Sequence, residues 1–549
     1  MLRATYAQKA LSQIPRLLSL QDRNPLSPTY GSFHRRYWLD KVDDFPDALP
    51  QFGVHSLALV YCHAFPDNPY LGQTRVRDWA IAGMMYWANI QHPDGTFDEF
   101  YPYERGWVGP TAFTTFAVCE AFQLLHQEMD EPVKTILLAA VRRAAQAIAQ
   151  GEQEEDKLAN HHAMACLALW KAYRLLGDKT ILAGYERIWQ GFLRHYHQPE
   201  GWSLEYDGVD PGYLSATISF LGKIYQENPT AELRRVLTEA VAFVSYVVYP
   251  DGYYGGMLGS RQTVHFYPHG LEIMAREMPT AAAIAQRLLR SLAHGGLVPP
   301  EIQADRYFLY RIPEFLQAYL DYTPRPESLP PLPYQSEPFR RYFSGAKIYA
   351  QKSADDRYLL VNAAKGGVLL LFDSQQEKRL TSDGGWLGQL TDGSVVTSQW
   401  IDPAYQIELN DTELRISGHL HKVPSAKLFT PARFLLFRLA LLTVGWSPTL
   451  SHWLKGAIRR NLMLGTRPVA ATFTRRLQLE TPFTLHDQLT SAGVHFHSLQ
   501  VGGEFFVRYV PQSRYFQKPE LSAAAYSLTP QELISLHHKG QWFYNRAYS

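Results

Sequence analysis

"PRPESLPPLPYQSEP" (residues 324–338) divides the sequence into two parts with different hydrophobic patterns, and it contains six prolines. Proline fixes φ and has no amide hydrogen, so neither a helix nor a central strand can run through such a stretch. We interpret it as a linker. The predicted architecture is an α domain over residues 1–323 followed by a β domain over residues 339–549.

Before the linker, apolar residues recur every three or four positions, which is the period of amphipathic helices. Clear examples are "VRDWAIAGMMYWANIQ" (76–91), "VKTILLAAVRRAAQAIAQGE" (133–152) and "HHAMACLALWKAYRLLGD" (161–178). These stretches have the length of globular helices and are separated by Gly, Pro and Asp turns. The pattern predicts a series of helical hairpins.

Three turns that follow predicted helices have related sequences. They are "HPDGTFDEF" (92–100), "QPEGWSLEY" (198–206) and "YPDGYYGGM" (249–257), each with proline, an acidic residue, glycine and an aromatic residue. Common turn chemistry also produces such sequences without any repeat. Together with the helical hairpins, they favour a repeated arrangement, which predicts an α/α toroid, closed or incomplete.

After the linker the apolar runs are shorter and are broken by Gly, Asn and Asp. Examples are "GAKIYAQKS" (345–353), "GSVVTSQWI" (393–401) and "YQIELNDTELRISGHLH" (405–421). This pattern is typical of strands joined by tight turns. It predicts an antiparallel β domain with a sandwich-like arrangement.

Residues 431–464 interrupt the β pattern with two predicted short helices around Ser447-Pro448. The segment contains two tryptophans and several basic residues: Arg433, Arg438, Trp446, Trp453, Lys455, Arg459 and Arg460. One interpretation is a monotopic contact with a membrane surface. We favour a helical insertion packed on the sheet, because the apolar run is short and is interrupted by Arg438.

The composition excludes some classes of partner. The net charge is +1, so no overall field attracts nucleic acid, and we expect no nucleic-acid partner. Aromatic residues make up 13% of the chain, which suits sugar binding but also suits large cores. No helical His-x-x-x-His pair or carboxylate cluster appears, so we expect neither a metal nor a cofactor. The oligomeric state is left open.

Cysteine usage and the N-terminal stretch bear on the compartment. Cys62, Cys119 and Cys166 lie in apolar helical contexts without metal-ligand spacing, which predicts buried free thiols. "MLRATYAQKALSQIPRLLSL" (1–20) lacks the features of a secretory signal, and no apolar stretch reaches the length of a spanning helix. We expect a cytoplasmic protein, with membrane association through 431–464 as the alternative.

Asn160 and His161 lie at the start of a predicted helix in "DKLANHHAMACLALW" (156–170). Asn is a preferred N-cap residue, so a purely structural role is one interpretation. The other is a role in substrate binding, because a helix N-terminus carries partial positive charge and favours an anion. The two interpretations are compatible.

A Gly-rich stretch, "GGMLGSRQTVHFYPHGLEIMA" (255–275), precedes another predicted helix. It gathers polar side chains at high density: Arg261, His265, Tyr267, His269 and Glu272. Burying so many polar groups is costly unless the loop binds something. His269 either orients a partner in such a site or caps the helix that starts at Gly270.

The order of these elements resembles the heparinase II/III-like polysaccharide lyases, whose relatives include oligoalginate lyases. The resemblance covers the two-domain layout and rests on Asn160-His161, on Tyr213 about one hairpin later, and on "GSRQTVHFYPHG" (259–270). It implies β-elimination at a uronic acid, in which a base removes the C5 proton and the glycosidic oxygen leaves C4. The expected partner is an acidic oligo- or polysaccharide.

The resemblance also implies residue roles. Asn160 and His161 would bind and neutralise the uronate carboxylate, and Tyr213 would act as base, acid or both. A free phenol has a pKa near about 10, so Arg261 or a histidine would have to lower the pKa of Tyr213. His265 is the second candidate for proton transfer.

A further cluster lies in "PDGTFDEFYPYERGWVGPTAF" (93–113). Arg105 could hold a carboxylate and Trp107 could stack on a sugar ring, or the loop could only seal two helices. The residues expected to bind substrate are Glu99, Tyr103, Arg105, Trp107, Arg261 and His269.

The sequence departs from the lyase pattern in its β part. Lyases of this group carry a histidine just after a strand there, and the corresponding stretch, 358–376, has none. The histidines of the β part lie elsewhere, at His419, His421, His486, His495 and His497. Two alternatives to a lyase therefore stand: a uronosyl C5-epimerase, and a non-catalytic glycan-binding or assembly protein of cell-surface polysaccharide production.

Overall fold

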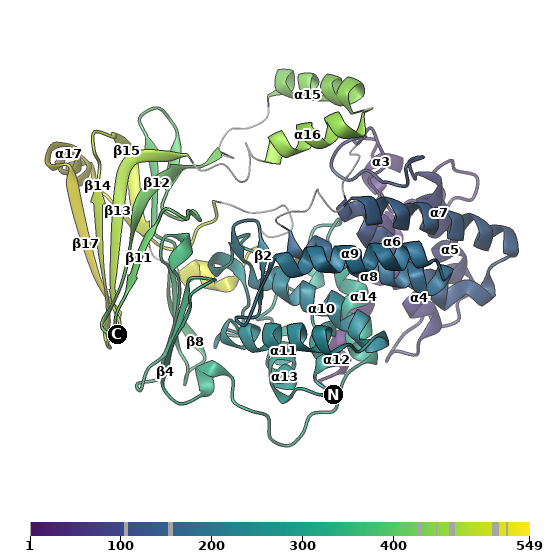
Figure 1. Cartoon of the computed structure of the whole chain (residues 1–549), viewed down its shortest axis with the longest axis horizontal. Coiled ribbons are helices and arrows are strands. Elements are labelled where there is room, and N and C mark those ends of the chain that lie inside the picture. Colours follow the sequence, from purple (N-terminus) through teal and green to yellow (C-terminus); the bar gives the residue numbers. More distant parts are fainter. Residues whose placement is uncertain are drawn as a thin grey trace.

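The computed structural model describes residues 2–103, 108–151, 158–424, 430–445, 447–459, 467–507, 515–522 and 525–548. Figure 1 shows a helical part that contains the N-terminus and a sheet part that contains the C-terminus. The main helices of the first part are α1 (Ala4–Leu11), α2 (Ile14–Leu20), α3 (Arg35–Trp38), α4 (Gly53–Cys62), α5 (Thr74–Asn89), α6 (Val108–Leu125), α7 (Glu131–Gln150), α8 (Ala159–Leu176), α9 (Lys179–Arg194), α10 (Pro211–Glu227), α11 (Ala231–Tyr246), α12 (His269–Met274), α13 (Pro279–His294) and α14 (Phe308–Leu320).

The helices form a closed double ring. In the inner ring α4, α6, α8, α10, α12 and α14 pack in that order, and α14 returns to pack against α4. The outer helices α5, α7, α9, α11 and α13 pack against the inner ring, and α1 covers α14. This arrangement confirms the predicted α/α toroid and shows that it is closed.

Burial explains the different patterns of inner and outer helices. The first fourteen residues of α8 are buried except His161, and α10 is buried on all sides over most of its length, so both sequences carry apolar residues on every side. The outer helices α9 and α13 bury one face only and carry charged residues on the other. A helix buried on all sides needs no polar face, whereas a surface helix needs one.

The three related turns are structurally equivalent. Gly95, Gly201 and Gly252 all have positive φ, between 81° and 87°. A Cβ on Gly95 or Gly201 would overlap a backbone carbonyl oxygen of α7 or α11, and one on Gly252 would meet Ser291 of α13. Each glycine therefore lets a turn press against an outer helix, which confirms that the turns belong to a repeat.

The strands form three antiparallel sheets. A small sheet joins α9 to α10 and consists of β1 (Tyr196–His197), β2 (Trp202–Glu205) and β3 (Gly208–Val209). The middle sheet has the order β4 (Phe339–Phe343), β5 (Ile348–Lys352), β6 (Arg357–Asn362), β7 (Val368–Asp373) and β8 (Lys378–Asp383). The outer sheet has the order β16 (Ala525–Ser527), β15 (Phe496–Gly502), β9 (Trp386–Leu390), β10 (Val395–Thr397), β12 (Glu413–Lys422), β13 (Pro468–Gln478), β14 (Phe483–Thr490) and β17 (Gln541–Tyr548), with β11 (Gln406–Leu409) beside β12.

The central strands of the middle sheet, β5, β6 and β7, are buried on both faces. Along β6, Tyr358 and Leu360 belong to the same core as the helices, whereas Leu359 and Val361 belong to the core shared with the outer sheet. Successive side chains of a strand point to opposite faces, so a strand between two cores must be apolar at every position. The order of layers is therefore helices, middle sheet, outer sheet.

The helical ring ends at Leu320 of α14, and the middle sheet begins at Phe339. A short 3-10 helix, Pro333–Gln335, lies between them, and Tyr334 is buried in the core of the helical part. Because one core includes residues from both sides of 324–338, the division into domains at 323 and 339 stays a prediction. The change from helix to strand at this stretch is nevertheless plain in the fold.

Two helices lie between β12 and β13 in the chain: α15 (Pro431–Val444) and α16 (Pro448–Arg459). They pack on each other and stand away from the sheet, near α3 (Figure 1). The favoured expectation of a buried insertion on the sheet is wrong, because the large apolar side chains of the pair are mostly exposed. Among the described residues, no helix combines the length and the apolar character needed to cross a bilayer.

Candidate functional site

Glu205, the last residue of β2, receives hydrogen bonds from two residues of other elements. Its carboxylate is fully buried and accepts from the backbone N–H and from the Nδ2 of Asn160, each at 2.8 Å. Arg261 Nη1 donates to the same carboxylate at 3.1 Å. Glu205 thus fixes Asn160 and Arg261 side by side.

Asn160 is not the N-cap of α8, because the helix begins at Ala159 and its cap position is Leu158. Its backbone N–H is one of the first-turn amides that have no partner inside a helix. The Glu205 carboxylate satisfies that amide from a separate strand. The carboxylate therefore sits at the positive end of the helix, which is where an anion is stabilised.

Arg261 also stacks on two aromatic rings. Its guanidinium carbon lies 3.9 Å from the centre of the Tyr213 ring and 4.8 Å from that of Tyr206. Asp210, the N-cap of α10, accepts hydrogen bonds from the backbone amides of Tyr213 at 3.1 Å and Arg261 at 2.9 Å. One buried carboxylate therefore holds the backbones of the two residues whose side chains stack.

The electrostatics of the cluster are dominated by burial. Burial raises the pKa of Tyr213 well above its usual value, and the nearby Arg261 cation only partly opposes this. Arg261 therefore does not lower the pKa of Tyr213 to near neutrality, and the phenol stays protonated at neutral pH. Burial likewise raises the pKa of Glu205, against the opposing effects of Arg261, the Asn160 hydrogen bonds and His161.

A second group of aromatic and cationic side chains adjoins this cluster. Arg311 of α14 lies 4.0 Å from the centre of the Tyr267 ring, and its Nη1 donates to the Phe266 carbonyl. His265 packs against Tyr515 with ring centres 5.4 Å apart. Burial lowers the pKa of Arg311, and the nearby Tyr267, Glu314, Tyr515 and Tyr213 partly oppose this effect, so these groups share one electrostatic environment.

Two buried N–H groups in this region have no hydrogen-bond partner among the described residues. They are Arg261 Nε and Arg311 Nη2. Buried donors in folded proteins are nearly always paired, so such groups call for an explanation. An anionic ligand that accepts from both arginines would provide one.

The structure brings some of the predicted residues together. Asn160, Tyr213 and Arg261 meet at Glu205, and His161 lies near enough to affect its pKa. The His161 ring also packs edge-on against Phe113 of α6, at 6.0 Å. His265 lies on the same loop as Arg261, and its ring packs against that of Tyr515.

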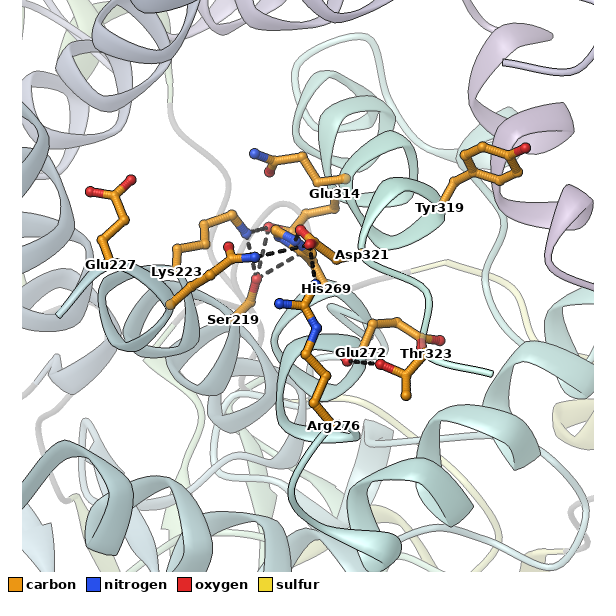
Figure 2. Close-up of polar contacts among 12 residues, drawn as sticks. Ser219, Lys223, Glu227, His269, Glu272, Arg276, Glu314, Tyr319, Asp321 and Thr323 are labelled. Carbon is orange, nitrogen blue, oxygen red and sulfur yellow. Dashed lines mark hydrogen bonds and ion pairs between the residues drawn. The ribbon is translucent and has the colours of Figure 1, made fainter. Parts of the chain in front are cut away.

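His269, the first residue of α12, belongs to a different group of side chains. Its Nε2 lies 2.7 Å from Asp321 Oδ2, and nearby Lys223 pairs with Glu314 at 2.5 Å (Figure 2). Ser219 donates to both oxygens of Glu314. This network ties α10, α12 and α14 together and gives His269 a structural partner, and its contact with substrate stays a prediction.

The predicted cluster at 93–113 is only partly described. Glu99 pairs with Arg306 at 2.9 Å, and Arg306 also pairs with Asp47 at 3.2 Å. The Tyr103 ring stacks on His92 at 6.0 Å. Arg105 and Trp107 lie outside the described residues.

The stretch of the β part that lacks the expected histidine contacts the loop before Arg261. Lys365 Nζ donates to the carbonyls of Met257 at 2.9 Å and Gly259 at 2.7 Å, and Asn362 Nδ2 donates to that of Leu258 at 2.7 Å. Here a buried lysine and an asparagine support the loop. Of the β-part histidines, His421 is fully buried, with Nε2 2.9 Å from Asp402.

Sequence reasoning missed Glu205, Asp210 and Arg311. The sequence Asp210-Pro211 fits an N-cap followed by proline at N1, so the position of Asp210 could have been found. No local pattern marks Glu205 or Arg311, because their partners lie on distant elements. Among the described residues, no group of three or more His, Cys, Asp and Glu side chains could hold a metal ion.

Comparison with known proteins gives a family match for part of the chain and a fold match for most of it. Residues 68–267 match the family described as the ulvan lyase N-terminal domain. No curated protein matches the chain.

Among solved structures, the Streptomyces coelicolor A3 chondroitin AC lyase in complex with chondroitin sulphate has a TM-score of 0.54 at 10% identity, covering 91% of this chain and 68% of that chain. A tyrosine-to-alanine mutant of the same lyase has a TM-score of 0.51 at 10% identity, with the same coverage. Heparinase III has a TM-score of 0.48 at 10% identity, covering 100% of this chain and 83% of that chain.

Proposed function

We propose that this chain, for which the domain match and the fold support a heparinase-like polysaccharide lyase family, cleaves a uronate-containing acidic glycan by β-elimination. One observation carries the proposal. Asn160 and Arg261 converge on a single buried carboxylate at the start of α8, and Tyr213 stacks on Arg261. Carboxylate-binding groups and a phenol that can transfer a proton therefore lie together.

The reaction needs this combination. The C5 proton of a uronate is not acidic while the neighbouring carboxylate carries its full charge. Donors that neutralise the carboxylate stabilise the enolate-like intermediate formed when the proton leaves. Arg261, through its unpaired Nε, is the proposed source of that stabilisation, and Glu205 holds Asn160 beside it.

The pKa of Tyr213 favours one of the roles that the sequence left open. A phenol that is protonated at neutral pH can donate its proton to the glycosidic oxygen as the C4–O bond breaks and the C4–C5 double bond forms. We assign the removal of the C5 proton to His265, which lies four residues after Arg261 on the same loop. The electron pair of the C5–H bond becomes the new double bond, and the leaving oxygen departs as a hydroxyl.

The unpaired arginine donors support an anionic substrate. Arg261 Nε and Arg311 Nη2 can each donate to a carboxylate or sulfate oxygen. Tyr267 and Tyr515 add aromatic surface beside them, which suits the apolar face of a sugar ring. The proposed substrate class is therefore a uronate polymer or oligomer that carries further negative charge.

One observation favours a non-catalytic alternative. Lys365 donates to loop carbonyls in the stretch where related lyases carry a histidine, so that stretch supports structure instead of chemistry. A protein with this arrangement could bind an acidic glycan without cleaving it. An epimerase would use the same proton removal and return a proton to the other face of C5.

A substrate screen separates these readings. Purified protein is incubated with ulvan, chondroitin sulphate, heparan sulphate and alginate, and the ultraviolet absorbance of unsaturated uronate products is followed. Rising absorbance with shorter chains supports the lyase. Solvent deuterium at C5 with unchanged chain length indicates an epimerase, and saturable binding without either change indicates a glycan-binding protein.

A further inference from the structure

The pair of helices α15 and α16 exposes an unusual amount of apolar surface. Seven large apolar side chains on the two helices are between 48% and 66% exposed: Phe434, Leu435, Leu436, Leu439, Leu442, Leu450 and Trp453. Large contiguous apolar patches are rare on soluble monomers and mark a surface that binds something. The patch lies outside the candidate functional site.

The exposed face of α15 is not its packing face. Arg438 Nη2 donates to Asp44 at 3.0 Å, the Phe437 ring lies 5.5 Å from that of Tyr101, and Leu441 is fully buried. Arg438 and Phe437 thus contact the helical part, and the buried Leu441 lies three and four positions after them. Leu435, Leu439 and Leu442 follow the same spacing on another side. The contacts with the helical part therefore hold this leucine stripe outward.

The charge of residues 422–467 indicates which kind of partner could cover the stripe of Leu435, Leu439 and Leu442. Residues 422–467 contain eight Lys and Arg and no Asp or Glu. A second copy of this chain, joined through the same face, would bring two such basic segments together without an acidic residue between them. An anionic surface, in contrast, attracts these basic residues, of which Arg438 and Lys422 already pair with Asp44 and Asp392.

The lengths of the helices determine how they could meet a bilayer. α15 has 14 residues and α16 has 12, and each is shorter than the roughly 20 residues that span a hydrocarbon core. An apolar stripe with basic residues and an exposed tryptophan instead suits a helix that lies in the plane of the interface.

We propose that α15 and α16 bind the chain to the surface of an anionic lipid bilayer, with the Leu435, Leu439 and Leu442 stripe and Trp453 in the interface. Basic residues of 422–467 supply the electrostatic attraction to the lipid headgroups. The proposal does not depend on the glycan reaction. It assigns a lipid partner to a segment that the candidate site does not use.

Vesicle sedimentation with the full chain tests the proposal. The chain should bind vesicles of phosphatidylcholine mixed with phosphatidylglycerol, bind phosphatidylcholine alone much more weakly, and lose affinity as salt is raised. Leu435→Ser, Leu439→Ser and Leu442→Ser together should weaken binding at least about tenfold, because three exposed leucines no longer enter the interface. Arg433→Gln should weaken it about fivefold.

The matched control replaces three exposed apolar residues elsewhere: Leu26→Ser, Ile302→Ser and Ile534→Ser. It should bind vesicles like the unchanged chain, and thermal unfolding should be similar for all variants. Equal binding by the leucine variant, or equal binding to both kinds of vesicle, would overturn the proposal. So would a dimer in light scattering that the leucine variant converts to a monomer, because a second copy would then cover the stripe.

Discussion

Single side chains decide the chemistry of the candidate site, and Glu205 is the one on which the others converge. It satisfies a first-turn amide of α8, the Asn160 side chain and Arg261 at once. Local sequence cannot predict the role of Glu205, because its partners lie on distant elements. Its role follows only from the way the small sheet brings β2 to the start of α8.

The first prediction concerns Tyr213. Tyr213→Phe removes the hydroxyl and keeps the ring on which Arg261 stacks. We expect the elimination rate to fall by about a hundredfold or more, the size typical of losing a positioned proton-transfer group, with the melting temperature nearly unchanged. The rate is measured from product absorbance, and turnover close to that of the unchanged chain would remove Tyr213 from the mechanism.

The second prediction concerns Glu205. Glu205→Gln replaces one carboxylate oxygen with an NH2 group. That NH2 group would face the N–H donors of Asn160 and Arg261, to which it cannot bond. We expect a loss of about 1–3 kcal/mol in unfolding free energy and at least a tenfold loss of rate. Denaturant unfolding and product absorbance measure the two effects. The control, Glu186→Gln on the exposed face of α9, should change neither.

Local sequence predicts some of these residues and not others. Asn160, Tyr213 and Arg261 stand out because they lie at helix starts or in a polar Gly-rich loop. Arg311 lies within a buried helix whose sequence resembles that of other core helices, so the neighbouring residues do not identify it as a site residue. The same limit explains His269, whose partner Asp321 comes from the end of a different helix.

At the scale of elements, helix packing sets the environment of His55, and the third prediction concerns its titration. His55 lies on α4, between the rings of Phe52 and Phe116, with Nε2 3.8 Å from Glu120. Burial lowers the pKa of His55 from 6.5 to about 4, with Lys171 and Lys223 adding to the effect and Glu120 and Glu314 opposing it.

The unfolded chain takes up this proton near pH 6.5, and the folded chain does so only near pH 4. The contribution to stability is thus fully present above pH 6.5 and is lost as the pH falls towards 4. Over that window His55→Gln should flatten the decline in unfolding free energy by about 3 kcal/mol, as measured by denaturant titration at several pH values. The exposed control His126→Gln should leave the decline unchanged, and an unaltered slope in His55→Gln contradicts the assignment.

The fourth prediction concerns the turn between β6 and β7. Lys365 holds two carbonyls of the loop that precedes Arg261. Lys365→Met keeps most of the apolar length but leaves both carbonyls without that donor. We expect a loss of about 1–3 kcal/mol in stability and a lower rate of elimination, because Arg261 is no longer held in place. An unchanged rate in the folded variant would show that the loop needs no support from the sheet.

Elements with strong patterns could be predicted, and elements fixed by context could not. The helices of 133–152 and 161–178 and the strand at 345–353 match their patterns. The helix α17 (Pro530–Lys539) has a capping box, Thr529 with Glu532, yet it sits inside a β region and was not predicted. For 431–464 the helices were predicted, but their surroundings were not, because periodicity does not say which face meets protein.

For the whole molecule, the middle sheet joins the two parts into one core. The buried Arg379 pairs with Asp251 of the helical part at 2.9 Å, and Tyr249 stacks on Phe372 of β7 at 5.4 Å. Glu200 accepts from the backbone amides of Gly345 and Ala346. Separate unfolding of the two parts would expose this shared surface.

The fifth prediction follows from that core. Calorimetry should give one unfolding transition, and Asp251→Asn should lower the stability of the whole chain by about 1–3 kcal/mol, because it removes one of two carboxylates that pair with Arg379. Asp305→Asn breaks an exposed pair with Arg16 and should cost less than about 1 kcal/mol. Two well-separated transitions, with only one shifted by Asp251→Asn, would contradict a shared core.

The glycine turns have a consequence for how such a ring can diverge. At Gly95 and Gly201 the contact that sets the turn against the next outer helix is with main-chain oxygen, which every residue type supplies. The outer helices can therefore exchange most surface residues over evolutionary time while the ring keeps its diameter. Mutation at the helix starts around Asn160 and Tyr213 can then change the candidate site without a new scaffold having to arise.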